Sequence, residues 1–297
     1  MVTVRVPAST ANLGPAFDCL GLALDLSNQA NFSLEGQGWQ IEITGEGQGR
    51  LPRSARNRMA RAFELVYTKT GQPLPPGVSL EAHNHIPLSS GLGSSSAAAL
   101  AGLLGANALL GGPFSQAEIL QLAADLEGHA DNVAAALYGG LVLVYSHKGR
   151  WQVQQLEHQP LRAVVLLPEA RLSTHESRAA LPAQVPLPAA VANIGHSLLL
   201  AEALRRGDLA LLALAMKDQL HQPARLALLP GAAEAIVAAQ ALGAAAALSG
   251  AGPGVIAFVE EGAEEAVGAA MRAAFRAAGL AARHYALNSS PHGAVVL

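Results

Sequence analysis

The sequence predicts an α+β protein with two domains. Strand-like segments dominate the first half of the chain, whereas most segments of the second half have the composition and spacing of helices. The chain has 297 residues, enough for two domains, and 51% of them are hydrophobic, so a sizeable core can form. We place the boundary near residue 160, which gives an N-terminal domain over 1–160 and a C-terminal domain over 161–297.

In the first half, residues 2–6 alternate as in a strand, and residues 7–19 are expected to form a loop. A helix is expected over 57–69, because apolar residues recur there at helical spacing and glycine and proline follow. Ser115 and Glu118 have the spacing of a capping box at the start of a helix over 115–127. The other elements expected here are a helix near 95–110 and strands over 20–26, 39–44, 78–85, 141–145, 151–156 and 161–167.

The second half is rich in alanine and leucine, which favour helices. We expect two strands, 244–248 and 255–259, around a glycine turn, and a last strand over 282–287. The expected helices cover 189–205, 209–221, 231–243 and 264–278.

The composition excludes several classes of protein. Only 14% of the residues are charged, and the net charge of −3 includes no basic stripe, which argues against nucleic acid as a partner. The single cysteine, Cys19, excludes an intramolecular disulfide and a cysteine-based zinc site, and it fits a reducing cytoplasm. The first residues have the pattern of a strand rather than a signal peptide, and the longest apolar runs are interrupted by glycine or polar residues. We therefore expect a cytoplasmic protein with no membrane-spanning segment.

The most informative segment is the Gly- and Ser-rich stretch from Pro87 to Ala99, Pro-Leu-Ser-Ser-Gly-Leu-Gly-Ser-Ser-Ser-Ala-Ala-Ala. It lies between a strand-like run and a strong helix former, and a helix N-terminus attracts anions through its unpaired N–H groups and its dipole. Gly91 and Gly93 let an anion approach the backbone, and the serines offer hydroxyls, so the segment is interpreted as a phosphate cradle. A plain serine-capped helix start is the alternative. Walker and dinucleotide loops do not fit, because the Gly-Lys-Ser/Thr ending and the later acidic residue are both missing.

A second polar segment, from Asp125 to Asn132, holds three carboxylates and a histidine near a helix end. Carboxylates so close together repel one another unless a cation or a hydrogen-bond donor joins them. Mg²⁺ takes one or two carboxylates and leaves its other positions to water and phosphate, which makes Glu127 a candidate metal ligand. The alternative is a solvated helix end, with Asp131 or Asn132 capping the next helix.

Two arginines stand in separate polar segments of the second half. Thr174 and Arg178 are four residues apart and share a helix face, and Arg225 ends the segment that begins at Asp218. A guanidinium binds a carboxylate at two points, so Arg178 and Arg225 are candidates to hold one carboxylate. Each of them alone is more often a surface residue.

Two further loops are rich in turn-forming residues. The loop over 7–21 contains Asn12 and Asp18, for which Asx turns are the structural alternative to a functional role. Ser249–Gly254 is a second glycine loop, which is either a plain hairpin or a close approach of the backbone to a ligand.

Taken in order, these segments resemble the homoserine kinase family of the GHMP kinase superfamily. The matching motifs run from residue 2 to about residue 258: Pro-x-Ser-x-Ala-Asn-Leu-Gly-Pro-x-Phe-Asp, Gly-Leu-Gly-Ser-Ser, Glu-Gly-His-x-Asp-Asn-Val-Ala, Thr-x-x-x-Arg, Asp-x-x-His-x-Pro-x-Arg and Ser-Gly-x-Gly-Pro. The resemblance implies the GHMP kinase fold, with an N-terminal domain like the second domain of ribosomal protein S5, a ferredoxin-like C-terminal domain and an active site between them.

The resemblance also implies the reaction. It is the transfer of phosphate from ATP, with Mg²⁺, to the side-chain hydroxyl of L-homoserine, which forms O-phospho-L-homoserine on the way to threonine. Adenine is expected near the helix that begins at Asn57, and Ser94 or Ser95 is expected to hold Mg²⁺ together with Glu127. The residues expected around the ATP phosphates are Pro87, Leu88, Ser89, Ser90, Gly91, Leu92, Gly93, Ser94, Ser95, Ser96 and Ala97.

For the substrate, the resemblance implies a pocket in which Arg178 and Arg225 suit the carboxylate of homoserine. Asp18 and Asp131 suit its ammonium and hydroxyl groups. We expect phosphoryl transfer to need no strong base, because alignment and charge neutralisation supply most of the catalysis, with Asp131 the candidate if a base takes part. By analogy with the family we also expect a homodimer. The remaining residues of the expected pocket are Asn12, His129, Thr174 and Gly250.

Two alternatives remain open at this point. Another kinase of the superfamily, acting on mevalonate, a sugar or shikimate, is disfavoured by the paired arginines and the Glu-Gly-His-Ala-Asp-Asn segment. A non-catalytic amino-acid sensor on the same fold is disfavoured because Glu127 and the serines of the loop are all present.

Overall fold

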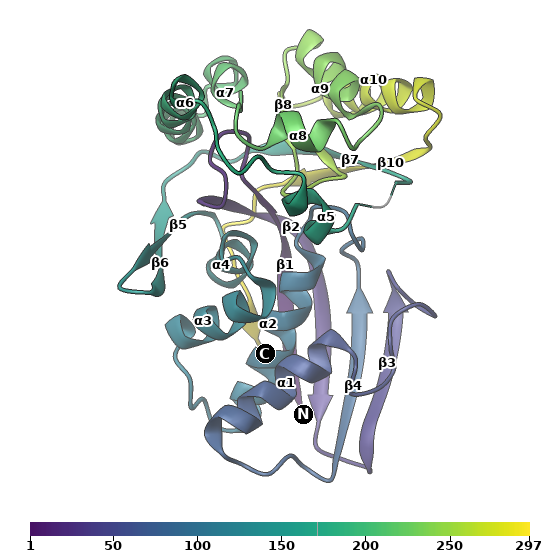
Figure 1. Cartoon of the computed structure of the whole chain (residues 1–297). Coiled ribbons are helices and arrows are strands. Elements are labelled where there is room, and N and C mark those ends of the chain that lie inside the picture. Colours follow the sequence, from purple (N-terminus) through teal and green to yellow (C-terminus); the bar gives the residue numbers. More distant parts are fainter. Residues whose placement is uncertain (171) are drawn as a thin grey trace.

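The computed structural model describes residues 1–170 and 172–297 and confirms the α+β architecture. Over these residues the strands form two sheets, which lie one above the other with helices against each of them (Figure 1). Most elements lie within a few residues of the expected positions.

The first sheet has the order β11-β1-β2-β4-β3, and β5 pairs with both β2 and β6. Strand β2 is long enough to have two partners on one side, because its beginning pairs with β5 and its end pairs with β4. The pair β3–β4 is parallel, and the others are antiparallel. The strands are β1 (Val2–Ala11), β2 (Leu20–Ser33), β3 (Gly38–Gly45), β4 (Gly77–Asn84), β5 (Leu141–His147), β6 (Arg150–Leu156) and β11 (Val295–Val296).

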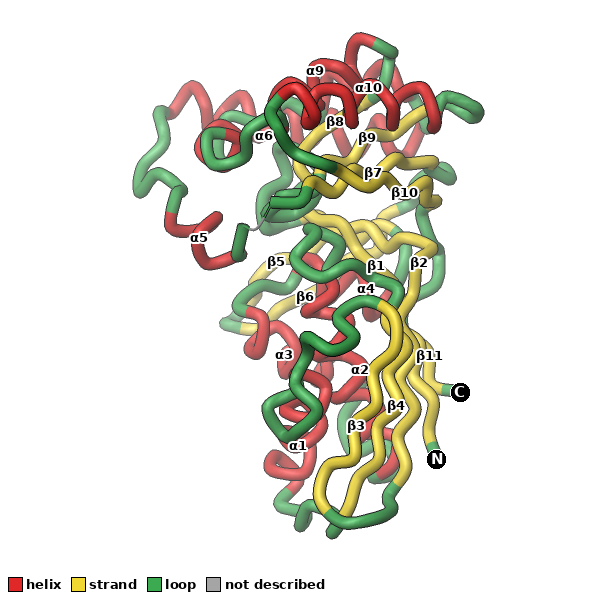
Figure 2. Tube along the Cα trace, turned by 90° about the vertical axis from the view of Figure 1, so that its right-hand side faces the viewer, coloured by secondary structure: helices red, strands yellow, loops and turns green. Residues whose placement is uncertain are grey.

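In the described part of the chain, helices pack on only one face of this sheet (Figure 2). They are α1 (Arg58–Thr70), α2 (Ser94–Leu109), α3 (Gln116–Glu127) and α4 (Asp131–Tyr138). The predicted capping box is confirmed: the Ser115 side chain accepts from the backbone of Glu118, whose carboxylate accepts from the backbone of Ser115. Asn57 caps α1 through a 2.9 Å bond from the Met59 amide to its Oδ1.

The second sheet is antiparallel, with the order β10-β7-β9-β8. Helices α9 (Ala232–Ala241) and α10 (Glu264–Ala277) pack on one face, and α6 (Leu187–Arg206) and α7 (Leu209–Ala215) lie against the other. The central strands are therefore buried on both faces, which explains their continuous apolar runs. The strands are β7 (Arg162–Pro168), β8 (Ala245–Leu248), β9 (Val255–Val259) and β10 (Ala282–Asn288).

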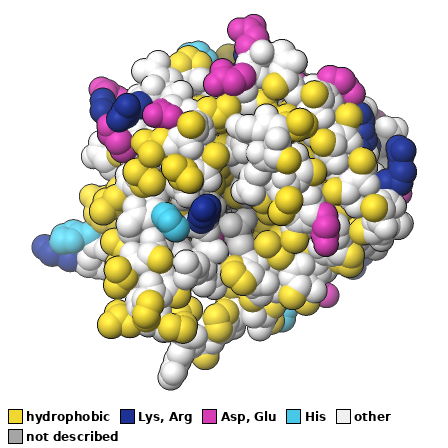
Figure 3. All heavy atoms as spheres, turned by 90° about the horizontal axis from the view of Figure 1, so that it is seen from above, with side chains coloured by type: hydrophobic (Ala, Val, Ile, Leu, Met, Phe, Trp, Pro, Cys, Tyr) yellow, Lys and Arg dark blue, Asp and Glu magenta, His cyan; other side chains and the backbone are white. Residues whose placement is uncertain are grey.

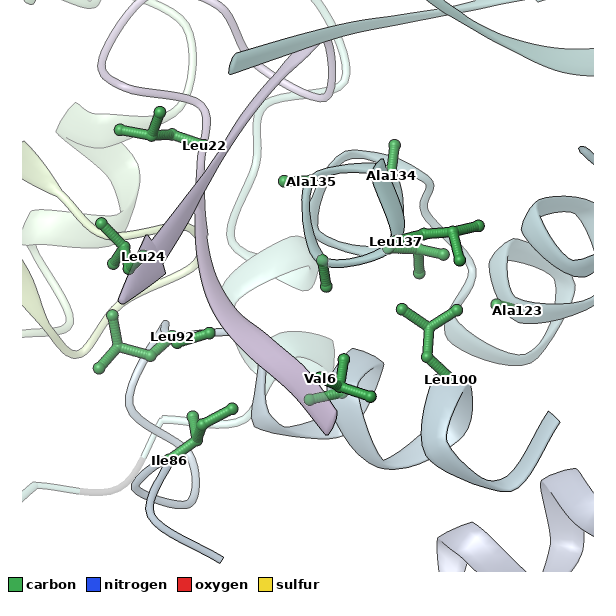
Figure 4. Packing of buried hydrophobic residues seen from close by; sticks show 14 of the residues in the cluster. Val6, Leu22, Leu24, Ile86, Leu92, Leu100, Ala123, Ala134, Ala135 and Leu137 are labelled. Atoms are coloured by element: carbon green, nitrogen blue, oxygen red, sulfur yellow. The ribbon is translucent and has the colours of Figure 1, made fainter. Parts of the chain in front are cut away.

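One buried cluster links the two halves of the chain. It contains residues of the first sheet and its helices, such as Leu22 and Leu100 (Figure 4), and also Val165 and Phe258 of the second sheet. The last strand, β11, returns to the first sheet and pairs with β1. The division of the chain near residue 160 stays a prediction.

Three expectations need correction. The segment 7–11 continues strand β1 instead of starting the loop, since it pairs with β2 beyond a bulge at Pro7/Ala8. Its residues are buried on both sides, so no alternation shows in the sequence. The expected helix over 209–221 ends at Ala215, and a short helix, α8 (Gln222–Leu226), follows. The Asp218 carboxylate explains the break, because it accepts from the amides of residues 220, 221 and 222 in the manner of a helix cap.

The third correction concerns α6. This helix is long and apolar enough to cross a membrane by length and composition alone, with a mean hydropathy of 1.3, although no run of that kind was expected. In the structure it packs beside α7, and its Asn193 and Ser197 side chains donate to the Pro15 carbonyl at 3.0 and 3.1 Å. Helix α6 is therefore docked on the loop that follows β1.

Candidate active site

The glycine- and serine-rich loops of both halves meet at one place between the two sheets. The loop Ser249–Gly254 joins β8 to β9 and also lies against the serine loop over 87–93. The Ser249 hydroxyl donates to the Gly91 carbonyl at 2.8 Å and lies 2.9 Å from the Thr10 hydroxyl of β1. The loop is therefore a hairpin that also fixes the serine loop, and its close approach to a ligand stays a prediction.

The two glycines of the serine loop have a packing role that the sequence did not predict. A Cβ on Gly91 would overlap the Ser249 carbonyl, and one on Gly93 would overlap the Ser9 hydroxyl. Both glycines have a positive φ, of 78° and 67°, which other residues rarely adopt. Glycine is therefore required here for the fit between loops and strands, whether or not an anion is bound.

A cavity of about 470 Å³ lies along the serine loop at the N-terminus of α2. Gly93 occupies the N-cap position and makes no side-chain cap, so the first N–H groups of α2 are free to bind an anion. The cavity has the size and the donors that a chain of phosphates requires. Its lining includes Ser89, Ser90, Gly91, Gly93, Ser94, Ser95, Ser96, Glu127, His129 and Asn132.

The Glu127 carboxylate is buried at the edge of this cavity, with its side chain 4% exposed. The Ser95 hydroxyl donates to its Oε1 at 3.1 Å, and the Ser96 hydroxyl donates to its Oε2 at 3.3 Å. A carboxylate and a serine hydroxyl beside a phosphate cavity are the oxygen ligands that Mg²⁺ takes, so the residues present fit this ion. Arg58, which was not among the expected residues, pairs with Glu127 and donates to the Leu126 carbonyl at 3.1 Å.

A second cavity, of about 340 Å³, lies between α1 and the serine loop. Its walls are largely apolar and include Ile43, Leu51 and Leu88, which suits a flat aromatic base. Asn57 contributes to the wall, but its side chain is already occupied, because Oδ1 caps α1 and Nδ2 donates to the Pro52 carbonyl at 2.9 Å. Both polar atoms of Asn57 therefore already hold the start of α1, and its contact with the nucleotide stays a prediction.

The residues expected around the substrate come together beside the phosphate cavity. The cavity that they line measures only about 20 Å³, room for about one water molecule. It is lined by Asn12, Asp18, His129, Asp131, Asn132, Arg178, Arg225, Gly250 and Ala251. Thr174 belongs to α5 (Thr174–Ala179), and its side chain lies outside the described part of the chain.

Arg178 and Asp18 are bound to each other. The guanidinium donates through Nη1 to Oδ2 at 3.0 Å and through Nη2 to Oδ1 at 2.8 Å. Burial acts to lower the pKa of Arg178, but the hydrogen bonds and the charge of Asp18 outweigh it and raise that pKa. The expected carboxylate-binding arginine thus has an internal carboxylate as its partner.

Arg225 is almost completely buried, at 2% exposure. Its Nη1 lies 3.3 Å from the Gly250 carbonyl and 3.1 Å from Nδ1 of His221, and its Nε has no partner in the described part of the chain. Burial lowers its pKa. The guanidinium also lies 5.1 Å from the centre of the Phe17 ring, which stacks on His221. Arg225 therefore keeps unused donor capacity at the wall of the small cavity.

His221 explains how Arg225 is held. Its Nε2 lies 2.8 Å from the Gly14 carbonyl, so that nitrogen carries the proton and Nδ1 is left to accept from Arg225. Burial lowers the pKa of His221, which keeps the ring neutral as this arrangement requires. Phe17 and His221 were not among the expected site residues, although both lie inside the motifs that carried the resemblance.

Asp131 is held by two donors. Its Oδ1 accepts from the Asn132 amide at 2.7 Å and lies 2.8 Å from Nδ1 of His129. Burial acts to lower the pKa of His129, but the hydrogen bond to Asp131 and the charges of Asp131 and Glu127 outweigh it and raise that pKa. Asn132 lines both the phosphate cavity and the small cavity, so it marks where the two meet.

Asn12 connects the two loops at the small cavity. Its Oδ1 accepts from the Asp18 amide at 3.0 Å, and its Nδ2 donates to the Gly250 carbonyl at 2.8 Å. Its φ of 70° is one that asparagine tolerates better than most residues. The expectation that the Asn12 side chain contacts the substrate stays a prediction, since both of its polar atoms already position neighbouring residues.

The chain is similar to known proteins over its whole length. The family model for the N-terminal domain of GHMP kinases matches residues 57–140, and the model for the GHMP kinase C-terminal domain matches residues 200–277. A homoserine kinase of Moorella thermoacetica is 48% identical over 299 residues, with 100% of both chains covered. A homoserine kinase of Trichormus variabilis is 42% identical, with 99% of this chain and 98% of the other covered.

Solved structures agree with the sequence relatives. The crystal structure of homoserine kinase from Cytophaga hutchinsonii has a TM-score of 0.86 at 33% identity and covers 100% of this chain and 97% of its own. The crystal structure of L. major mevalonate kinase in complex with R-mevalonate has a TM-score of 0.72 at 18% identity and covers 97% of this chain and 96% of its own. This second likeness concerns the fold alone.

Proposed function

Because the chain belongs to the homoserine kinases of the GHMP kinase family, we propose that it phosphorylates the side-chain hydroxyl of L-homoserine at the junction of its two polar cavities. One observation carries this assignment of the site. Two arginines and two aspartates line a small cavity directly beside the cavity at the helix N-terminus. Homoserine carries one carboxylate, one ammonium group and one hydroxyl, which these side chains complement.

The substrate is proposed to take the place of an internal ion pair. Its ammonium group binds Asp18, and its carboxylate binds Arg178 together with the free donors of Arg225. The exchange conserves charge, so neither Arg178 nor Asp18 is left without a partner when they separate. The side chains of this pair are 37% and 35% exposed, which lets them part, and the small cavity has to open in this way to admit an amino acid.

ATP is proposed to place its base in the apolar cavity beside α1 and its phosphates at the N-terminus of α2. Glu127 and the hydroxyl of Ser95, or that of Ser94, would hold Mg²⁺. When bound, this ion supplies neutralisation of the phosphate charge during transfer. None of the chain's three lysines is a partner of Asp131 at this site. We therefore propose that Asp131 positions the acceptor hydroxyl instead of acting as a strong base.

The experiment that tests this function compares acceptors. With Mg²⁺-ATP present, ADP formation is measured with L-homoserine, mevalonate, galactose and shikimate at equal concentrations. A clear preference for L-homoserine is expected. Preference for one of the other three would contradict the proposal. Binding of homoserine in a calorimeter without any ADP formation would favour an amino-acid sensor.

We also propose that the chain acts as a homodimer in the cytoplasm. Support for the dimer comes from α6, where Leu187, Val191, Ile194 and Leu198 are exposed at spacings of four, three and four residues, as in helices that pair with a copy of themselves. Figure 3 views this end of the molecule and shows hydrophobic side chains spread between a few charged ones. Light scattering should give twice the chain mass, and Ile194→Lys should return a monomer. A monomeric native protein would contradict the dimer.

A further inference from the structure

Asn84 is a buried amide at the wall of the apolar cavity. It is the last residue of β4 and is 4% exposed. Its Oδ1 is buried and has no hydrogen-bond partner among the described residues. A buried acceptor without a donor is costly, so an atom of this kind at the edge of a ligand cavity points to a donor on the ligand.

The orientation of this amide is determined by its neighbours. Nδ2 donates to the Glu46 carbonyl at 3.2 Å, while the Glu46 amide donates to the Asn84 carbonyl at 2.8 Å. Rotating the amide by half a turn would bring Oδ1 against the Glu46 carbonyl, which has no proton to donate. Asn84 therefore presents an acceptor, and only an acceptor, as its unpaired atom.

The side-chain oxygens of the other two asparagines of the cavity already accept hydrogen bonds from the backbone. Oδ1 of Asn28 accepts from the amides of His85 and Ile86 at 2.8 and 2.9 Å. Oδ1 of Asn57 caps helix α1. Among the three asparagine side chains that line this cavity, Asn84 alone keeps an unpaired oxygen. A buried, unpaired acceptor in the cavity wall discriminates between bases that differ in one donor.

We propose that Asn84 selects adenine over guanine nucleotides by accepting a hydrogen bond from the amino group at C6 of the purine. Guanine and hypoxanthine carry a carbonyl oxygen at C6, which would face the Asn84 oxygen with lone pair against lone pair. This inference rests on the proposed function, because it assigns the apolar cavity to the base of the phosphate donor. It adds the residue that determines which nucleotide is accepted.

A series of nucleotides tests the native protein first. KM and kcat are measured with L-homoserine as acceptor and ATP, purine riboside triphosphate, ITP or GTP as donor. ATP is expected to have the lowest KM. Purine riboside triphosphate, which has only hydrogen at C6, should be weaker by about tenfold, and ITP and GTP weaker still. Equal KM values for ATP and GTP would overturn the proposal, while homoserine phosphorylation itself would stand.

A pair of variants then locates the preference. Asn84→Leu removes the acceptor and keeps the branching of the side chain, and it should raise the KM for ATP about tenfold while leaving the KM for GTP and for homoserine unchanged. His83→Leu is the matched control, since it lies one residue earlier on β4 and does not line the cavity. An ATP preference that survives in Asn84→Leu would overturn the proposal. If Asn84→Leu does not fold, the nucleotide series decides alone.

A separate binding measurement distinguishes failure of the proposed function from failure of the role of Asn84. Nucleotide binding is measured separately, by calorimetry with ATP and GTP in the absence of any acceptor. A preference for ATP that depends on Asn84, without phosphorylation of homoserine, would retain the role of Asn84 and reject the acceptor.

Discussion

Arg178 and Asp18 hold one another in a two-point ion pair, with Nη1–Oδ2 and Nη2–Oδ1 distances of 3.0 and 2.8 Å. Asp18 lies in the loop between β1 and β2, and Arg178 lies on α5, which follows the second sheet's first strand. Residues from both halves of the chain thus close the small cavity. The charge of Arg178 complements the carboxylate of an amino acid, and the charge of Asp18 complements its ammonium group.

Replacing Arg178 should weaken substrate binding more than turnover. Arg178→Lys keeps the charge but loses the two-point geometry, so the KM for homoserine should rise about tenfold with a smaller change in kcat. Steady-state kinetics at saturating ATP measure both constants. Arg205→Met is the matched control, because Arg205 makes an exposed pair with Glu202 on α6. An unchanged KM in Arg178→Lys would exclude Arg178 from the substrate.

Replacing Arg58 should destabilise the protein without nucleotide. Arg58→Met leaves the buried Glu127 carboxylate with only its serine donors, and the free energy of unfolding should fall by about 1–2 kcal/mol. Thermal melting with and without Mg²⁺-ATP measures this loss. We expect the ligand to restore most of it, because the cation then compensates Glu127. A loss that persists undiminished with saturating Mg²⁺-ATP would contradict the assignment of Glu127 to the metal.

The packing role of Gly91 predicts a large effect of a single methyl group. Gly91→Ala forces a Cβ into the Ser249 carbonyl at a positive φ, so unfolding in urea should show a loss of about 1–3 kcal/mol. Gly195→Ala is the control: Gly195 lies within α6 with no atom near the position of a Cβ, and alanine there should be neutral or stabilising. Equal stabilities of the two variants would argue against the fit of the two loops.

Asp131 is predicted to position the acceptor hydroxyl without removing its proton in a strong base step. Asp131→Asn keeps the size of the side chain and its bond from the Asn132 amide, so turnover at saturating substrate should fall by about tenfold or less. A strong base would be worth about 10²–10⁴-fold. Single-turnover measurements separate this step from product release, and a loss at the upper end of that range would assign the base to Asp131.

His221 should make stability depend on pH. Burial lowers its pKa in the folded chain below the ordinary value of 6.5, so the unfolded chain binds a proton first as the pH falls. Its contribution to stability is therefore complete above about pH 6.5 and is lost as the pH falls through the folded pKa. Urea unfolding at several pH values between 7.5 and 5 should show a smaller loss in His221→Gln than in the native chain. Identical pH profiles would show that His221 does not carry this effect.

The sequence by itself determined the features that depend on neighbouring residues. The helix that begins near Asn57 and the capping box at Ser115 were predicted correctly, because each needs only residues within a few positions along the chain. The serine loop before α2 and the order of the motifs were likewise readable, and they led to the family. The prediction of one helix over 209–221 was wrong, because the Asp218 carboxylate competes locally for the backbone amides. The apolar pattern of the segment hides this effect of Asp218.

Only the tertiary structure decided which polar groups meet. Arg178 and Asp18 are 160 positions apart, and Arg58 and Glu127 are 69 apart, so nothing local relates the members of either pair. The serine loop was predicted to cradle phosphate, but the reason for glycine at position 91 is a carbonyl from the other half of the chain. Such contacts form only when the sheets pack together. The energies of ion pairs and close contacts depend on distances that a sequence of residue types does not contain.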